Sequence, residues 1–314
     1  MAHEIEIIDG KAQMAYVGET PWHGLGHKLP EGVSPAQMMK AAGLDWTVEK
    51  RPNFINTQRG AKKTGTFSLV RSTDERVLTQ VGPDWNPVQN EQAFNFFHEF
   101  CAAGQMDMHT AGSLRDGKYV WALAKVGSDF ELFNGDKIEG FLLFSNPHQF
   151  GKSIDVKFTP IRVVCQNTLT LSLNTTSENQ VRLTHRGQFD PEMVKTTLGI
   201  ASAQMSQYRE TAEILGSKQM TDKKFKDFLG KVFGESKRSE KLGRTAQLAY
   251  DLLETQPGAE FAPGSWWSGL NAATYVMDHM QGRTVDTRLA NVWFGLGRGK
   301  KIKAVQTAME MATA

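Results

Sequence analysis

The sequence has only two cysteines, Cys101 and Cys165, among its 314 residues. Two thiols are too few for the disulfide framework of a small secreted protein or for a cysteine-rich zinc site, and they are typical of a reducing cytoplasm. Long apolar runs are also missing, since no stretch approaches the roughly 20 apolar residues that a membrane span needs. The first residues are acidic where a signal peptide is basic. We therefore expect a cytoplasmic protein that does not associate with a membrane.

An excess of charge of one sign is absent as well. Lys and Arg number 36 against 34 Asp and Glu, a formal net charge of +2, so the whole chain does not indicate a polyanionic partner. Residues 1–190 hold 19 Lys and Arg against 21 Asp and Glu, and residues 191–314 hold 17 against 13. Any nucleic acid must therefore be bound by a local basic patch. A composition with 40% hydrophobic residues excludes disorder as the state of the whole chain.

Motifs for catalysis and for metal or cofactor binding are scarce. His23 and His27 are four residues apart, but the glycines between them predict a loop, and no glutamate follows His23 as in zinc proteases. No serine lies in a nucleophile motif, and Cys165 fits a buried core thiol. Gly151-Lys152-Ser153 resembles the end of a phosphate loop, but the glycine required five residues earlier is Asn146. We predict no metal, no cofactor and no catalytic residue.

The patterns that are present predict an α+β protein with an antiparallel sheet, β-hairpins and packed helices, followed by a mainly helical C-terminal half. The predicted domains are an α+β domain over 1–190 and a helical region over 191–314. Hydrophobic periodicity and the positions of Gly, Pro and capping residues define the elements. Strands are expected at 46–54, 66–71, 76–81, 106–114, 118–126, 137–145 and 152–158, and helices at 34–43, 87–104, 191–215, 221–233, 241–254, 265–280 and 300–312. Residues 18–32 are expected to form an ordered loop.

Two local signals are especially informative. Asp116-Gly117 between two alternating segments predicts a β-hairpin with a two-residue turn, which would place Arg115 opposite Lys118. Thr159-Pro160 predicts the start of a helix, with a strand as the alternative for the later part around Leu169 to Leu173.

Basic residues occur at positions where a cation is unfavourable unless an anion is bound. Arg162 would lie in the first turn of the predicted helix, against the helix dipole, and four cations crowd the start of the last helix. Lys157 lies on a strand face opposite its apolar neighbours, and Lys152 lies beside that strand. The predicted phosphate contacts are Arg115, Lys118, Lys152, Lys157, Arg162, Arg298, Lys300, Lys301 and Lys303. The alternative at each position is a solvated surface cation.

Four segments resemble the phage/plasmid-like family of unknown function. They are Ala15-Tyr16-Val17 with the segment 21–26, the segment 111–118 with 121–124, the run Arg162-Val-Val-Cys-Gln-Asn-Thr168, and 291–301. The resemblance implies an origin on a mobile element and a place in the bacterial cytoplasm. It does not imply an activity.

The order of a hairpin, further antiparallel strands and a helix, with basic residues on the β face, is similar to the core of ring-forming single-strand annealing proteins. This resemblance implies a protein that holds the phosphate backbone of single-stranded DNA in a basic groove, as a homo-oligomeric ring, and that needs neither nucleophile nor metal. Two alternatives remain open from the sequence. One is a hydrolase or nucleotide-modifying enzyme that uses the His23/His27 loop or Cys165, and the other is a protein-binding counter-defence module.

Overall fold

The structure is a computed structural model that describes residues 5–21, 24–102, 105–133, 135–162, 167–168, 180–185, 206–234, 242–281 and 296–314. The chain forms two compact units. Unit 1 comprises residues 1–127, 142–157 and 180–198, and unit 2 comprises 128–141, 158–179 and 199–314. The strands β9, β10 and β11 each contribute to both units. The predicted boundary near residue 190 falls outside the described residues.

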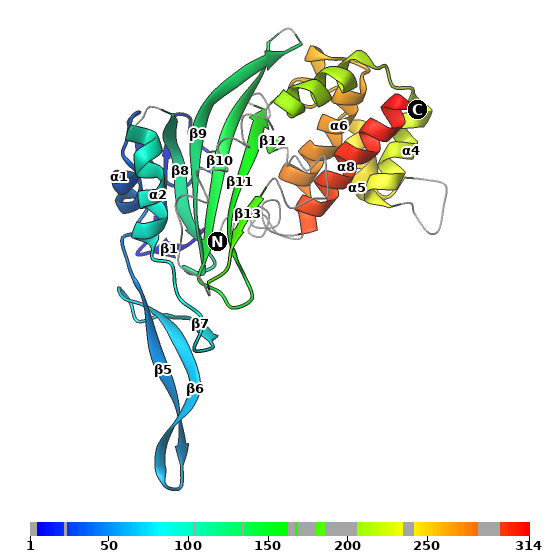
Figure 1. Cartoon of the computed structure of the whole chain (residues 1–314). Coiled ribbons are helices and arrows are strands. Elements are labelled where there is room, and N and C mark those ends of the chain that lie inside the picture. Colours follow the sequence, from blue (N-terminus) through cyan, green and yellow to red (C-terminus); the bar gives the residue numbers. More distant parts are fainter. Residues whose placement is uncertain are drawn as a thin grey trace. The chain divides into compact units, whose positions relative to one another are not determined.

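Unit 1 is built on antiparallel β-structure with two helices (Figure 1). Its elements are β1 (Ile7–Ile8), β2 (Lys11–Ala12), β3 (Met14–Val17), β4 (His27–Leu29), α1 (Pro35–Ala41), β5 (Val48–Thr57), β6 (Gly60–Arg71), β7 (Val77–Val81), α2 (Asn90–Ala102), β8 (Met106–Leu114), β9 (Tyr119–Leu132), β10 (Asp136–Pro147), β11 (Ile154–Arg162) and β13 (Gln180–Leu183). The main sheet has the order β12-β11-β10-β9-β8-β3-β4, with β13 also paired to β11. A second sheet has the order β5-β6-β7.

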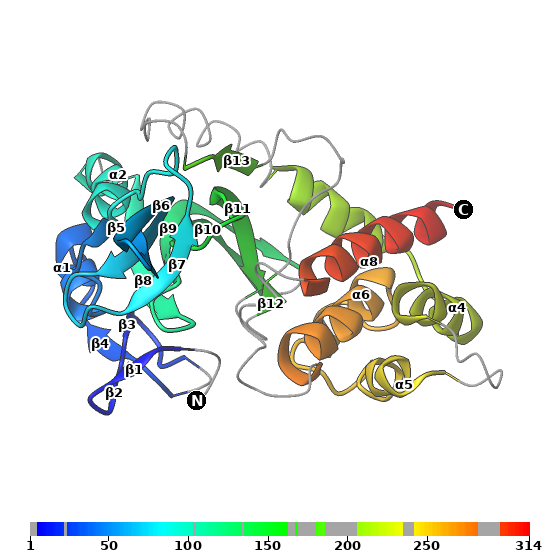
Figure 2. The same ribbon diagram turned by 90° about the horizontal axis from the view of Figure 1, so that it is seen from below.

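Unit 2 is mainly helical (Figure 2). Its elements are β12 (Asn167–Thr168), a helical segment at 206–217, α4 (Asp222–Phe233), α5 (Arg244–Asp251), a 3₁₀ turn (Ala259–Phe261), α6 (Trp266–Tyr275), a π-helical turn (Val276–Met280) and α8 (Leu296–Thr313). The predicted fold class is confirmed, with antiparallel sheets and hairpins in the N-terminal half and helices in the C-terminal half.

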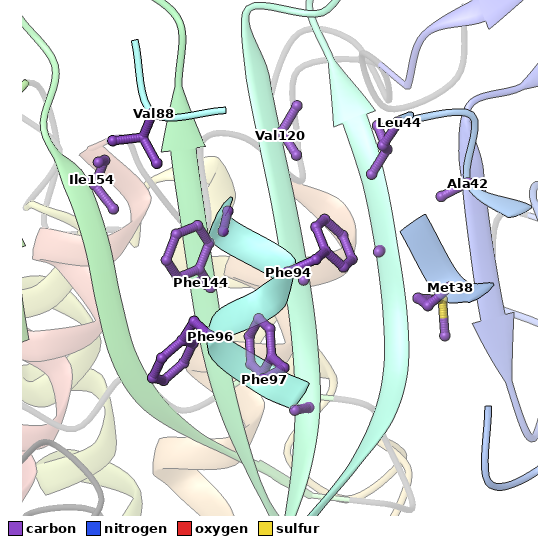
Figure 3. Packing of buried hydrophobic residues seen from close by; sticks show 14 of the residues in the cluster. Met38, Ala42, Leu44, Val88, Phe94, Phe96, Phe97, Val120, Phe144 and Ile154 are labelled. Atoms are coloured by element: carbon purple, nitrogen blue, oxygen red, sulfur yellow. The ribbon is translucent and has the colours of Figure 1, made fainter. Parts of the chain in front are cut away.

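The core of unit 1 lies between α2 and the main sheet (Figure 3). Three phenylalanines of α2, Phe94, Phe96 and Phe97, are at most 3% exposed. The rings of Phe96 and Phe97 lie 6.2 and 6.0 Å from that of Phe144 on β10. Phe94 and Phe97, three residues apart, lie on the same side of the helix, and the buried Phe96 widens this apolar side, so α2 covers the sheet.

Helix starts follow their local sequence signals. Ser34 caps α1 with Pro35 as the first helical residue, and Gln37 completes the reciprocal capping box by accepting from the Ser34 N–H. Thr221 caps α4 by accepting a hydrogen bond from the N–H of Lys224. Both helices were predicted, because a cap needs only residues within one turn of the chain.

The predicted hairpin at Asp116-Gly117 is confirmed, but its two-residue turn is wrong. Leu114 pairs with Tyr119, so residues 115–118 form a four-residue connection. Arg115, Asp116 and Gly117 all adopt positive φ angles, of 54°, 58° and 84°. Arg115 and Lys118 are therefore turn residues and not a cross-strand pair.

The predicted helix start at Thr159-Pro160 is also wrong, because β11 continues through this segment to Arg162. Residues 154–157 of β11 pair with β13, and Ile161 and Arg162 pair with β12. Pro160 lies between these two paired segments, where a residue without an N–H is tolerated. Pairing with β12 and β13 outweighs the local helix signal. Residues 169–179, which carry the alternating leucines, lie outside the described part of the chain.

A strand also occurs within the segment predicted as a loop over 18–32. β4 pairs in parallel with β3, with His27 opposite Ala15 and Leu29 opposite Val17. The glycines around it predict turns correctly, but they carry no information on a strand partner ten residues earlier.

Gly117 allows a close approach between the hairpin turn and the second sheet. A β-carbon at Gly117 would lie 2.7 Å from Nη1 of Arg71, whereas one at Gly18, which has the same φ of 84°, would meet nothing within 4 Å. We expect Gly18→Ala to cost about 1 kcal/mol of unfolding free energy through backbone strain alone. Gly117→Ala should cost about 1–2 kcal/mol more, because overpacking adds to the strain. Thermal denaturation of both variants measures the difference, and equal losses would contradict the close approach.

Candidate nucleic-acid interface

Two turns of unit 1 bring three of the predicted basic residues to the same end of the main sheet. The N–H of His148, just after β10, donates to the carbonyl of Lys118 in the β8–β9 turn at 2.8 Å. This bond joins the turn at 115–118 to the connection at 148–153. Arg115 and Lys152 are exposed and Lys118 is half-buried. We call Arg115, Lys118 and Lys152 the basic turn cluster.

Two of the three cations in the basic turn cluster, Lys118 and Lys152, lie apart from the carboxylates of the described parts of the chain. The one carboxylate in the β8–β9 turn, that of Asp116, is 3.1 Å from Nη1 of Arg76. Within the described parts of the chain, no carboxylate lies at ion-pairing distance from Lys118 or Lys152. The Arg115 guanidinium lies 5.4 Å from the centre of the Tyr119 ring, which holds it beside the start of β9.

Buried polar side chains hold the β10–β11 connection in place. The fully buried ring of His148 makes a 3.0 Å hydrogen bond through Nε2 with Oδ1 of Asn90 on α2. The Asn90 amide donates to the carbonyl of Leu44, so its oxygen accepts and His148 Nε2 donates. The Asn146 amide donates to the carbonyl of Val88 at 2.8 Å. These bonds fix the end of β10 and the first residue of the connection that carries Lys152.

His148 and a second buried histidine, His185, are both neutral at pH 7. Burial, with a smaller contribution from His185, lowers the pKa of His148 to about 3. Burial also lowers the pKa of His185 to about 4, although its Nδ1 lies 3.3 Å from the carbonyl of Asn86. The His185 ring stacks on Trp85 with centroids 4.0 Å apart. At neutral pH these rings add no positive charge beside the basic turn cluster.

A buried ion-pair network ties the second sheet to the hairpin turn. The Arg71 guanidinium, 0% exposed, donates to Glu6 at 2.8 Å and to both carboxylate oxygens of Asp74 at 2.9 and 2.6 Å. The Ser113 hydroxyl donates to the other oxygen of Glu6 at 2.8 Å. Burial by itself would lower the pKa of Arg71, but the bonds to Asp74 and Glu6 outweigh it and raise that pKa. The end of β6 is thus anchored beside the basic turn cluster.

The other predicted phosphate contacts are distributed over both units of the chain. Lys157 lies in the part of β11 that belongs to unit 1, where it pairs with Gln180. Arg162 lies in unit 2 and pairs with Asn167 in a strand, so the argument from an unfavourable helix dipole no longer applies to it. Arg298 lies in the first turn of α8, also in unit 2.

Lys301 is a correction within the predicted C-terminal cluster. Its side chain is 0% exposed and forms an ion pair with the buried Asp278 of the π-helical turn. A lysine whose charge is matched inside the fold is unable to contact a phosphate. Lys300 and Lys303 of the same helix are exposed.

The residues named for an enzymatic alternative are mostly outside the described part of the chain. His23 and Cys165 are among the residues that the structure leaves undescribed, and His27 is exposed on β4. Burial, and secondarily Asp107, raises the pKa of the Cys101 thiol to about 11, which disfavours the reactive thiolate. Among the described residues, no three His, Cys, Asp or Glu side chains are grouped to hold a metal ion. Nor does any helix in those ranges have the length and apolar character to cross a membrane.

Comparison with known proteins relates the chain to one family. The family model described as Domain of unknown function (DUF932) matches residues 77–293, more than two thirds of the sequence. The chain belongs to the DUF932 family. No curated protein and no solved structure matches it.

The DUF932 match begins at β7 and includes β8 to β11 with the whole basic turn cluster. It also includes Lys157 and Arg162, whereas Arg298, Lys300, Lys301 and Lys303 follow its end. The hairpin of β5 and β6 precedes its start.

That hairpin is a feature that the prediction of separate phosphate contacts missed. Residues 48–71 contain one acidic residue, Glu49, and six basic ones, namely Lys50, Arg51, Arg59, Lys62, Lys63 and Arg71. A count of charges over windows of this size would have identified the segment. The two strands were predicted separately and shorter, at 46–54 and 66–71, so their continuation into one long basic hairpin was not foreseen.

Proposed function

We propose that the chain is a DNA-binding protein of a phage or plasmid that holds the phosphate backbone of single-stranded DNA. We propose further that it acts in the bacterial cytoplasm as a single-strand annealing protein. The observation that carries the proposal is the pairing of the two basic turns, because the His148–Lys118 backbone bond brings Arg115, Lys118 and Lys152 to one end of the sheet.

The chemistry of the basic turn cluster suits a phosphate backbone. Lysine and arginine neutralise phosphates and release condensed counterions, a contribution that does not depend on base sequence. Tyr119 and Trp121, the aromatic residues nearest the turn on β9, are 6% and 1% exposed and are unable to stack on bases. A strand held through its phosphates alone keeps its bases available for pairing, as annealing requires.

The binding test removes the three cations. We expect Arg115→Ala, Lys118→Ala and Lys152→Ala together to weaken binding of a fluorescent 30-nucleotide oligo-dT at least 10-fold at 50 mM salt. The slope of log affinity against log salt should become shallower by about 2, since each phosphate contact on a single strand contributes about 0.7. Fluorescence anisotropy at four salt concentrations measures both quantities.

A matched variant controls for the change in net charge. Lys223, Lys224 and Lys231 are exposed on α4, and replacing all three by alanine removes the same charge from unit 2. This control should bind oligo-dT as the wild type does. Equal affinity and equal salt slope of the turn variant and the wild type would refute the assignment of this surface.

Assembly on DNA is tested separately. If the protein forms a ring on single-stranded DNA, light scattering after size exclusion should show a discrete oligomer whose mass depends on the oligonucleotide. The annealing rate of two complementary oligonucleotides should rise in parallel. If the protein binds oligo-dT but stays monomeric and leaves the annealing rate unchanged, the result would support DNA binding and refute the annealing function.

A further inference from the structure

We propose that the hairpin of β5 and β6 is an arm that binds duplex DNA by inserting its tip into a groove. The arm tip consists of residues 54–66, all of which are exposed. Figure 1 shows the hairpin reaching well beyond the strands that anchor it. The proposal extends DNA binding to a second form of DNA, and it rests on residues that the basic turn cluster does not include.

The arm tip carries positive charge that the described fold leaves unmatched. Arg59, Lys62 and Lys63 are exposed, and among the residues that the structure describes no carboxylate lies at ion-pairing distance from them. The cations at the base of the hairpin are different. Arg51 pairs with Glu49 at 2.8 Å and Glu75 at 3.2 Å, and Lys50 bonds to the carbonyl of Pro83. Within this hairpin, the cations of the tip are therefore the ones left without an anionic partner for a polyanion to replace.

Apolar side chains stand beside these cations on both faces of the ribbon. Phe54 is 53% exposed and pairs with Lys63, while Ile55 is 52% exposed and pairs with Lys62. Directly paired residues share a face and successive residues alternate, so each face presents one apolar side chain and one lysine. Lysines alone would fit protection of an exposed edge, whereas exposed Phe54 and Ile55 beside them give each face apolar surface that binding to a partner would cover.

The arm is held in a defined shape, although a two-stranded ribbon alone is only marginally stable. A bulge interrupts its register between Pro52 and Phe54, opposite Gly65 with a φ of 81°. Asn53 bridges this bulge: its amide donates to Thr66 at 3.1 Å, and its side-chain oxygen accepts from Ser68 at 2.6 Å. Below the bulge, the buried Arg71 anchors β6. The bulge therefore sets the direction of the tip before any ligand binds.

These features fit duplex DNA better than a single strand. Two-stranded ribbons are known to bind in the major or the minor groove of duplex DNA, where the phosphates along both walls would meet cations on both faces. Apolar side chains that wedge between base steps are typical of proteins that bind the minor groove and bend DNA. Binding a single strand by stacking needs a row of aromatic residues. The arm tip has one, Phe54.

The first experiment removes the charge of the arm tip. We expect Arg59→Ala, Lys62→Ala and Lys63→Ala together to weaken binding of a 30-base-pair duplex at least 10-fold and to make its salt slope shallower by about 3. Binding of oligo-dT should change less than 2-fold. The α4 triple variant Lys223→Ala, Lys224→Ala and Lys231→Ala is the control and should bind the duplex normally. Because the substituted side chains are exposed, we expect thermal stability to be unchanged.

The second experiment tests insertion of the apolar residues. Energy transfer between dyes at the two ends of the duplex reports bending, which the wild type should produce. Phe54→Ser with Ile55→Ser should abolish the bend while lowering affinity less than the charge variant does. A wild type that binds the duplex without bending it would overturn the insertion mechanism.

The outcomes separate this proposal from the single-strand function. Loss of duplex binding only in the arm variant, with loss of oligo-dT binding only in the turn variant, supports both proposals. The arm proposal alone is overturned if the wild type does not bind duplex DNA. It is also overturned if the arm variant binds duplex DNA with the same affinity and salt slope as the wild type. An arm variant that changes the oligomeric mass in light scattering but not duplex affinity would identify the arm as a contact between copies and equally overturn the proposal.

Discussion

Replacing Arg71 by alanine should lower the free energy of unfolding by about 3–5 kcal/mol, because it leaves the buried carboxylate of Glu6 without its main partner. Glu6 is 2% exposed, and its second oxygen is already bonded to Ser113. Arg76 lies 3.5 Å from Glu6 but is half-exposed, so it compensates only in part. For a protein of this size the loss corresponds to a fall in Tm of roughly 10 °C, measurable by calorimetry.

Arg51 supplies a matched control for the Arg71 variant. Like Arg71 it belongs to the β5–β6 hairpin and has two carboxylate partners, but its side chain is 45% exposed. We expect Arg51→Ala to lower the free energy of unfolding much less than Arg71→Ala does, because water screens an exposed ion pair. Removing both buried charges, with Arg71→Met and Glu6→Gln, should recover much of the loss. A single Arg71→Ala variant as stable as Arg51→Ala would contradict a structural role for the buried network.

Acid should destabilise unit 1 through the buried histidines His148 and His185. In the folded protein the pKa is about 3 for His148 and about 4 for His185, below the 6.5 of an unperturbed histidine. As the pH falls, the unfolded chain therefore binds protons at these residues before the folded chain does. Their contribution to stability is therefore complete above pH 6.5 and is lost progressively as the pH falls toward 4. At pH 5, about 1.5 pH units below the unfolded value, the loss is about 2 kcal/mol for each ring. Thermal denaturation between pH 7.5 and 4.5 should follow this dependence.

Other groups also titrate in this range, so the decisive quantity is the difference between variants. His148→Gln with His185→Gln should be less stable than the wild type at pH 7.5, because the buried hydrogen bonds change, but its Tm should depend less steeply on pH. His27→Gln, at an exposed position of β4, controls for the substitution itself and should leave the Tm at pH 7.5 unchanged. A double variant with the wild-type slope would show that the buried histidines do not control acid stability.

The described parts of the fold were predictable where the signals are local. The cap at Ser34, the cap at Thr221 and the positive φ angles around Asp116-Gly117 each depend on a few neighbouring residues. The predicted elements at these places therefore match in type, with shifted ends. The strand continuing through Pro160 was missed, because its pairing with β12 and β13 outweighs the helix signal of its own residues.

The candidate site was predictable only in part. Arg115, Lys118 and Lys152 could be placed in connections between strands from the sequence, but not beside one another. In the sequence Lys301 cannot be distinguished from its basic neighbours, but in the fold its buried side chain forms an ion pair with Asp278. The sequence does not show whether a charged side chain will be buried against a partner that is distant in the chain.

The amino-acid sequence by itself determined an α+β chain, the caps and turns of its elements, and a near-neutral charge that requires any polyanion to be bound locally. Only the tertiary structure decided which cations stay exposed, which two turns meet through His148 and Lys118, and that two basic strands form one long arm. The physical reason is the separation in sequence between the groups that interact. Caps and turns are satisfied within one turn of the chain, whereas strand partners, burial and charge pairing depend on segments that are far apart in sequence.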